Sequence, residues 1–320
     1  MLKDINYQPK LIPWLISQGE FKDEPVRILD IGARAGLEEH WQFYEDRIKQ
    51  IGFEPDINEC ERLNRESNNS NHKFYPVALG RKQETRPFSV CEWGGSSSFY
   101  PANMDYLKRF ADENGKLMQV KEQIELETID LDTFSTQEQL GEIDFIKLDV
   151  EGSELDILQG GKNCLHNVMG LSLEVLFHNS LRHQPTFSEI DLWLSSHGFK
   201  LFDLALYRHA RKALPLPANS LGASEQGQVL WGQALYLRDA VAEMNENSFW
   251  SRERILKLAS MMELFCLPDC AIELLQEAAA KNILTESIES LCNLLVPQIY
   301  SDKQPTNISY ANYLKTFQKV

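Results

Sequence analysis

Three carboxylates crowd into six residues of the segment IDFIKLDVEGSELDILQGG, at Asp149, Glu151 and Glu154. Negative charges this close together raise a carboxyl pKa toward values that suit proton transfer at neutral pH. Asp149 or Glu151 could therefore act as a general base or position a substrate. Glu154 stands at the start of a predicted helix, where an acid equally well does no more than stabilise the helix dipole. The apolar run before Asp149 predicts a buried strand, and ligands of open α/β sheets bind at the carboxyl ends of such strands.

A second segment, LDIGARAG, has the residue types of a cofactor turn. Asp30 ends an apolar run, and Gly32 allows the backbone to approach a ligand closely. A helix is expected to start after this turn and to offer free N–H groups. The spacing D-x-G-x-x-x-G, which ends at Gly36, fits an S-adenosylmethionine site. It fits a dinucleotide site poorly, because glycines are needed where Arg34 and Leu37 stand. A tight β–α turn without a ligand is the alternative.

Glu54 ends the next predicted strand in the segment GFEPD, 22 residues after Gly32. An acidic residue near this spacing can accept both ribose hydroxyls of an adenosine cofactor. The alternative is a solvated carboxylate at a strand end. Because the glycine turn precedes it, we favour ribose binding.

Two further features indicate where a substrate that accepts the transferred group would bind. His178 follows an apolar strand and, as an imidazole, is a plausible base, although a surface loop histidine is at least as good an alternative. Arg208, Arg211 and Lys212 form a positive island, because residues 204–224 contain no acid. We expect these three residues to lie on a mobile loop between the last two strands and to bind an anionic acceptor. A solvated loop is the alternative.

Apolar runs bounded by glycine, proline or polar residues predict the scaffold for these side chains. Strands are predicted at residues 26–31, 50–53, 73–78, 86–91, 123–127, 143–148, 170–176, 200–206 and 229–237, and helices at about 37–49, 56–67, 153–166 and 186–197. Strands that alternate with helices predict an α/β fold. We expect a Rossmann-like, doubly wound, mostly parallel sheet with an antiparallel edge strand.

The end of the chain has a different composition, since all 17 glycines lie before residue 233. Apolar residues at helical spacing predict helices at 251–265, from Pro268 onward, and at about 285–296. We expect three parts, namely a helical lead-in at 1–25, the α/β domain at 26–240 and an all-helical subdomain at 241–320. The subdomain either docks on the rest of the chain or forms the surface of a homodimer.

Charge and cysteine usage narrow the classes of function. The 320 residues carry a formal net charge of −15, which repels nucleic-acid phosphates. No run approaches the roughly 18 apolar residues of a membrane span, and the start of the chain lacks the pattern of a secretory signal. The six cysteines include no CxxC pair, so we expect reduced thiols and a cytoplasmic location.

In a series of motifs the chain resembles the FkbM-type methyltransferases, which are class I enzymes that use S-adenosylmethionine. The motifs run in the order LDIGARAG, GFEPD, VALG, GGSSSFY, ETIDLDTF, IKLDVEGSELDILQGG and LSLEVLF. The resemblance covers about residues 26–206 and, with the closing strands, extends nearly to 240. It implies methyl transfer, most often to a hydroxyl of a sugar or natural product. One departure is Arg34, where such enzymes usually carry asparagine, and the helical tail lies outside the resemblance.

The resemblance and the residue arguments above together predict particular site residues. Those expected to bind S-adenosylmethionine are Asp30, Gly32, Ala33, Arg34, Gly36, Glu54, Pro55, Ala78 and Asp149. Those expected to meet a small-molecule or glycan acceptor are Ser97, Ser98, Arg208 and Arg211, and those expected to carry the chemistry are Asp149, Glu151 and His178. A divalent metal on Asp149, Glu151 and Glu174 is conceivable, but the resemblance requires none and we predict none.

Two other classes of function stay open from the sequence. A catalytically degenerate methyltransferase fold that binds or scaffolds would fit Arg34 and the extra helices. A nicotinamide-dependent oxidoreductase is disfavoured by the missing glycines. The sequence names neither the acceptor atom nor the oligomeric state.

Overall fold

Contacts within the chain divide it into two compact units. The computed structural model describes residue 2 and residues 4–67, 69–111, 114–245, 249–297, 299–301 and 304–317. The first unit is built chiefly from Arg27–Leu37 and Lys49–Arg238, and the second from Lys3–Val26, Glu38–Ile48 and Asp239–Val320. The second unit therefore draws on both ends of the chain and on a short segment between the first two strands.

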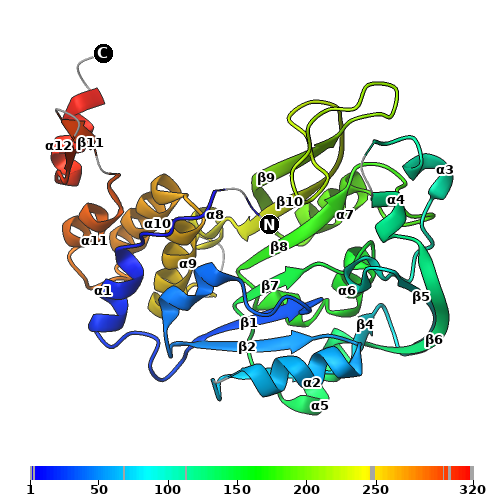
Figure 1. Cartoon of the computed structure of the whole chain (residues 1–320). Helices are drawn as coiled ribbons and strands as arrows, with labels where there is room; N and C mark the ends of the chain where they lie inside the picture. The colour runs from blue at the N-terminus through cyan, green and yellow to red at the C-terminus, as the bar shows by residue number, and fades with distance from the viewer. Residues whose placement is uncertain are drawn as a thin grey trace. The chain divides into compact units, whose positions relative to one another are not determined.

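A seven-stranded sheet runs through the first unit (Figure 1). Its strands in chain order are β1 (Val26–Ile31), β2 (Ile48–Phe53), β3 (His72–Tyr75), β7 (Phe145–Leu148), β8 (Gly170–Leu176), β9 (Phe199–His209) and β10 (Gln228–Arg238). Across the sheet the order is β3-β2-β1-β7-β8-β10-β9. β1, β7 and β8 pair in parallel, as do β2 and β3, whereas β10 is antiparallel to β8 and β9. The predicted Rossmann-like fold with an antiparallel hairpin at one edge is confirmed.

Helices alternate with these strands along the chain, which is why the strands read as nearly continuous apolar runs. The helices of this unit that follow strands of the sheet include α2 (Ile57–Glu66), α6 (Glu154–Gly160) and α7 (Phe187–Ser196), and α5 (Leu131–Glu138) precedes β7. Buried side chains shared by sheet and helices form the main core, among them Leu29, Ile31, Phe53, Ile146, Leu148, Ile157, Leu158, Leu171, Leu173, Ile190 and Leu194. α2 and α5 begin at side-chain caps, which are Asp56 and Asp130. The core and the caps together hold the carboxyl ends of the strands in place.

One predicted helix is wrong. Residues 37–49 form only a short 3-10 helix, η1 (Glu39–Tyr44), and β2 begins at Ile48. The spacing of Trp41, Tyr44 and Ile48 mimics a helix face, but Glu45 adopts a left-handed φ of 53° and ends the turn. Therefore no α-helix follows the glycine turn after β1, and that turn has no helix N-terminus to offer a ligand.

A second, three-stranded sheet belongs to the same unit. It consists of β4 (Ala78–Gly80), β5 (Glu84–Cys91) and β6 (Val120–Asp130). β4 is parallel to β6, and β5 is antiparallel to it. The single strand predicted at 73–78 is in fact two, because Pro76 lacks a backbone N–H and separates β3 from β4. Beyond β5 come η2 (Gly94–Ser96), α3 (Met104–Leu107) and α4 (Asn114–Leu117).

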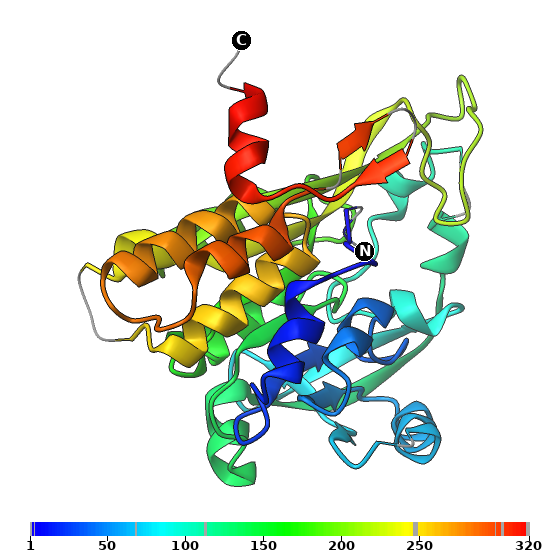
Figure 2. The same cartoon turned by 90° about the vertical axis from the view of Figure 1, so that its left-hand side faces the viewer.

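The second unit is mainly helical (Figure 2). Besides η1, its elements are α1 (Leu11–Ser17), α8 (Ala240–Glu243), α9 (Arg252–Leu264), α10 (Pro268–Ala280), α11 (Ile288–Leu295), β11 (Ile299–Ser301), β12 (Gln304–Thr306) and α12 (Tyr310–Phe317). α10 packs against both α9 and α11. The predicted helices at 251–265, from Pro268 and at 285–296 are confirmed as α9, α10 and α11, whereas the β11–β12 pair was not predicted. None of the helices among the described residues is long and apolar enough to cross a bilayer.

A buried carboxylate joins the lead-in segment to the C-terminal helices within this unit. Glu263 of α9 accepts from the backbone N–H groups at the start of α1, at 2.7 Å from Lys10, 3.0 Å from Leu11 and 3.3 Å from Ile12. Lys10, the N-cap residue of α1, supplies no side-chain cap of its own. Glu263 therefore satisfies N–H groups that would otherwise lack a partner.

We expect Glu263→Ala to lower the free energy of unfolding by about 2–4 kcal/mol, because three N–H groups lose a charged acceptor. Glu273→Ala removes an exposed carboxylate from α10 and should change it by less than about 0.5 kcal/mol. Urea unfolding followed by circular dichroism measures both. Equal midpoints and slopes for the two variants would contradict the capping role.

Candidate active site

The turns after β1 and β7 touch one another. A Cβ atom added to Gly32 would lie 1.9 Å from the carbonyl oxygen of Asp149, so a side chain has no room there. The backbone N–H of Asp149 donates to Ile31 O at 3.0 Å. The N–H groups of Gly32 and Ala33 donate to Phe53 O, at 3.1 and 3.0 Å. The ends of β2, β1 and β7 are thus tied together at one edge of the sheet.

The ammonium group of Lys147, on β7, links the same two turns. Its Nζ lies 3.1 Å from Asp30 Oδ1, donates to Gly32 O at 2.9 Å and lies 3.8 Å from Asp149 Oδ2. Asp30 is 3% exposed, and its Oδ2 accepts from Gln50 Nε2 at 3.0 Å. Burial raises the pKa of Asp30, whereas the charge of Lys147 lowers it. Lys147 was not among the predicted site residues, although a charged residue inside the apolar run IDFIKL is a local signal for it.

Glu54 lies at the end of β2, where a ribose-binding carboxylate is predicted, and Pro55 follows it. It is 5% exposed, and its Oε1 accepts from the backbone N–H of Asp56 at 2.9 Å. Arg34 Nε lies 3.7 Å from Glu54 Oε2, and Arg34 Nη2 donates to Asp56 Oδ2 at 2.9 Å. Burial raises the pKa of Glu54, whereas the Asp56 N–H and the charge of Arg34 lower it. Arg34, which stands where the FkbM-type enzymes usually carry asparagine, therefore contacts the predicted ribose-binding carboxylate of Glu54.

The turn after β7 is held in one conformation. Glu151 and Gly152 have positive φ angles of 53° and 97°, and Ser98 Oγ donates to Glu151 O at 2.6 Å. Glu154 Oε1 accepts from the N–H groups of Val150 at 3.1 Å and Gly152 at 3.4 Å. Burial raises the pKa of Glu154 to about 7. Of the two roles left open for Glu154, these contacts favour a structural one, in which it caps the turn.

The carboxyl ends of β7 and β8 form a second cluster of charge. Burial, and then the charge of Asp149, raise the pKa of Glu151 well above its ordinary value. Burial and the charge of Glu151 do the same for Glu174 on β8. Glu174 Oε2 is closed to solvent and has no hydrogen-bond partner among the described residues. A carboxylate with a raised pKa binds a proton more tightly than an exposed one, and such groups are common at catalytic sites.

Metal binding finds no support in the arrangement of these side chains. Among the parts of the chain that the structure describes, no three His, Cys, Asp or Glu side chains are placed to hold a metal ion. Asp149, Glu151 and Glu174 influence one another through their charges.

The two predicted acceptor serines bond to the protein itself. Ser97 and Ser98 follow η2, and Ser98 is 2% exposed. The hydroxyl of Ser97 accepts from Cys91 N at 3.1 Å, and that of Ser98 accepts from Tyr100 N at 2.9 Å. Together with the bond to Glu151 O, these contacts make Ser98 a support for the turn after β7.

The two predicted arginines differ in their local structure, because β9 ends between them. Arg208 lies within β9, and its Nη1 donates to Gly227 O at 3.3 Å. Arg211 follows the strand, and its guanidinium carbon lies 4.0 Å from the centre of the Phe110 ring. The prediction that both lie on a loop is wrong for Arg208, because β9 continues to His209.

His178 lies just beyond β8. Its Nε2 is 2.8 Å from Gln228 Nε2, and its ring centre is 6.0 Å from that of Tyr106. No local pattern singles out Tyr106 or Gln228, because the fold alone brings them to His178. Ala78, the remaining predicted cofactor residue, is buried at the start of β4 and pairs with Thr128.

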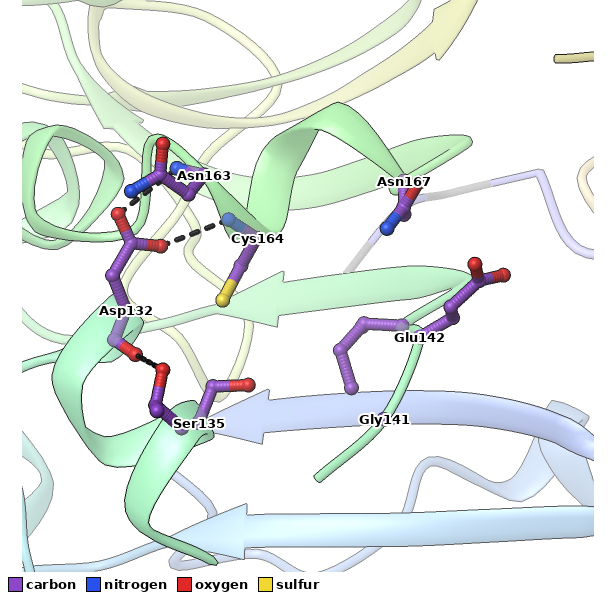
Figure 3. A pocket seen from close by; sticks show the side chains of 9 residues that line it. Asp132, Ser135, Gly141, Glu142, Asn163, Cys164 and Asn167 are labelled. Atoms are coloured by element: carbon purple, nitrogen blue, oxygen red, sulfur yellow. Dashed lines mark hydrogen bonds between the residues drawn. The ribbon is translucent and has the colours of Figure 1, made fainter. Parts of the chain in front are cut away.

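A cavity of about 220 Å³ lies at the other end of β7, beside the residues that precede this strand (Figure 3). Asp132, one of its lining residues, accepts from the N–H groups of Asn163 and Cys164 at 2.9 and 2.8 Å. Burial raises the pKa of the Cys164 thiol to about 11, so this thiol stays protonated. The cavity therefore contains neither a reactive thiol nor any of the predicted site residues.

The strand order, the glycine turn after β1 and the acidic residue after β2 define the class I methyltransferase fold. The family described as the methyltransferase FkbM domain matches residues 30–201, which is more than half of the chain. The chain belongs to this family.

Individual relatives are more distant. The chain is 31% identical over 160 residues to the 2-O-methyltransferase NoeI of Sinorhizobium fredii (strain NBRC 101917 / NGR234), a match that covers 45% of this chain and 60% of that protein. The chain thus spans less than two thirds of that relative. The crystal structure of methyltransferase FkbM from Methylobacillus flagellatus KT is 15% identical, with a TM-score of 0.36, over 67% of this chain and 43% of that one. Magnesium protoporphyrin IX methyltransferase from Synechocystis PCC 6803 is 10% identical, with a TM-score of 0.32, over 72% and 76%.

Lys147→Met should destabilise the chain by about 3–5 kcal/mol, because Asp30 stays buried without its cation. The double variant Asp30→Asn with Lys147→Met removes both charges and should recover most of that loss. Urea unfolding of the wild type, both single variants and the double variant forms a complete cycle. Effects that simply add would show that the two side chains do not depend on each other.

Proposed function

We propose that this chain binds S-adenosylmethionine at the ends of β2, β1 and β7 and methylates a hydroxyl group of a sugar, glycan or natural product. The observation that carries the proposal is the alignment of Glu54, the Gly32 turn and the Asp149 turn on three adjacent strand ends. Family membership supports methyl transfer, and the match to a 2-O-methyltransferase supports oxygen as the acceptor atom.

The residues at this edge fit an adenosine cofactor. The buried carboxylate of Glu54 can accept the two ribose hydroxyls once Arg34 moves away from its Oε2. Gly32 and Ala33 keep the turn free of bulky side chains, and Gly36 completes it with a φ of +74°. When bound, the cofactor supplies an electrophilic methyl group on a sulfonium. Holding donor and acceptor in line can lower the barrier by up to about 7–11 kcal/mol in favourable cases.

The acceptor hydroxyl must lose its proton as its oxygen bonds to the methyl carbon. We assign this proton to Glu151 in its ionised form, because burial raises the pKa of this carboxylate and makes it a stronger base. A base of this kind contributes roughly 10²–10⁴ in rate. To Asp149, whose side chain is 43% exposed, we assign the role of orienting the acceptor. Arg211 beside His178 supports an acceptor that carries negative charge.

One observation favours a second candidate, a fold that binds partners without turnover. Arg34 pairs with Glu54 and Asp56, so the ribose carboxylate already has a cation beside it. If this ion pair is permanent, the cofactor site is closed. The six cysteines are free thiols, which supports a reducing, cytoplasmic setting for either candidate.

Calorimetric titration with S-adenosylhomocysteine separates the two candidates. We expect wild-type protein to bind it and Glu54→Gln to bind at least about tenfold more weakly, because the neutral amide loses the charged acceptor. Glu61→Gln makes the same change at an exposed position of α2 and should bind within about twofold of wild type. No heat of binding with wild type would favour the scaffold.

The same titration has a predictable pH dependence. Burial raises the pKa of Glu54, and the carboxylate form is the one that accepts hydroxyl donors. Affinity should be full above this pKa and should fall as the pH drops through it, in a series from about pH 8 to about pH 5. Glu54→Gln should show a flat profile over that range. A wild-type profile as flat as that of the variant would remove Glu54 from the binding site.

A further inference from the structure

A cluster of aromatic, cationic and amide side chains lies beside His178. The Arg211 guanidinium carbon is 4.0 Å from the centre of the Phe110 ring and 5.5 Å from that of Tyr106. The rings of Tyr106 and His178 are 6.0 Å apart, and Gln228 contacts both Arg211 and His178. These residues come from α3, from the ends of β8 and β9 and from the start of β10, so the cluster depends on the fold.

The backbone fixes Arg211 against the segment that follows α3. The N–H of Ala111 donates to Ala210 O at 2.9 Å, and the N–H of Lys212 donates to Arg109 O at 3.0 Å. Arg211 lies between these two bonds, with its guanidinium over an aromatic ring. A planar guanidinium held flat on an aromatic face keeps its N–H groups in a defined plane. Arg211 is thus better ordered than a cation on a mobile loop.

Hydrogen-bond direction assigns the protons of His178. A guanidinium only donates, so the bond from Arg211 Nη2 must end on Gln228 Oε1. The amide nitrogen of Gln228 then faces His178 Nε2 at 2.8 Å and donates to it. His178 Nε2 therefore carries no proton, and in the neutral ring the proton is on Nδ1. The lone pair that the predicted base would need is already used, so His178 acts here as a donor.

Two polar atoms of this cluster are left without partners. Tyr106 Oη and Arg211 Nη1 are closed to solvent and have no hydrogen-bond partner among the described residues. Buried polar groups are almost always bonded, and an unbonded cationic donor is especially costly. No carboxylate among the described residues pairs with Arg211. A ligand oxygen that enters the cluster would give either atom a hydrogen-bond partner.

We propose that Tyr106, Arg211 and His178 form a subsite for an oxyanion of the methyl acceptor, either a carboxylate or a phosphate ester. All three can present N–H or O–H donors, so the chemistry selects an acceptor of hydrogen bonds with negative charge. Arg211 Nη2 is occupied by Gln228, so Nη1 and Tyr106 Oη each hold the oxyanion by a separate bond. The inference rests on the proposed function, because it describes the acceptor side of that site.

Calorimetry with three sugars tests the subsite. Glucuronate, glucose 6-phosphate and uncharged glucose are titrated into the full chain, with and without S-adenosylhomocysteine. We expect at least one charged sugar to bind at least about tenfold more tightly than glucose, and the tighter of the two identifies carboxylate or phosphate ester as the source. Arg211→Gln and Tyr106→Phe should each weaken that binding about tenfold. Lys200→Gln removes an exposed positive charge from β9 and should leave it within about twofold.

Tyr106→Phe also serves as a control, because it tests the subsite with a variant that should fold as the wild type does. Its hydroxyl bonds to nothing in the described structure, so the variant should unfold at the wild-type temperature or slightly above. Charged sugars that bind no better than glucose, or binding that both variants retain, would overturn the subsite. Because the sugars are also titrated without S-adenosylhomocysteine, failure of the cofactor proposal is seen separately.

A spectroscopic readout tests the proton assignment independently. The ¹⁵N spectrum of the imidazoles should show the Nδ1-protonated form for His178 in the wild type and a change in the tautomer ratio in Gln228→Leu. An Nε2-protonated His178 in the wild type would contradict the donor role.

Discussion

The backbone of the turn after β1 contacts the backbone of the turn after β7, and this contact constrains the whole candidate site. Gly32 lies so close to the Asp149 carbonyl that even a methyl group would force the strand ends apart. Because β1 lies between β2 and β7 in the sheet, this contact and the bonds from Gly32 and Ala33 to Phe53 gather three strand ends at one point. The side chains expected to meet the cofactor are carried on those ends.

Electrostatics divide this edge into two regions. On the β1 side, Lys147 balances the buried Asp30, and Arg34 balances Glu54 and Asp56. On the β8 side, burial and the charges of neighbouring carboxylates raise the pKa values of Glu151 and Glu174. Such a division suits a reaction in which ionised carboxylates anchor the cofactor and a neighbouring carboxylate with a raised pKa takes up a proton. The positive φ of Glu151, supported by Ser98 and Glu154, holds the second region in a strained conformation.

Local patterns in the sequence were enough for the sheet and most of its helices. Apolar runs such as VRILDI and GLSLEVL become β1 and β8 at the predicted residues, since burial on both faces dictates their composition. The prediction of a helix at 37–49 was wrong because Glu45 adopts a left-handed φ, although three apolar residues before and after it have helical spacing. Arg208 was predicted to lie on a loop because the predicted strand ended at residue 206, whereas β9 continues to His209. Lys147, Tyr106 and Gln228 could not be chosen beforehand, because their importance comes from partners distant in the chain.

The cofactor site is the centre of this account, and a crystal structure of the chain with S-adenosylhomocysteine tests it most directly. We expect the ribose hydroxyls to bind the carboxylate of Glu54, with Arg34 moved away from Glu54 Oε2 and the ligand lying across the Gly32 turn. Density for the ligand at another place, or an Arg34–Glu54 pair that persists beside it, would contradict the account.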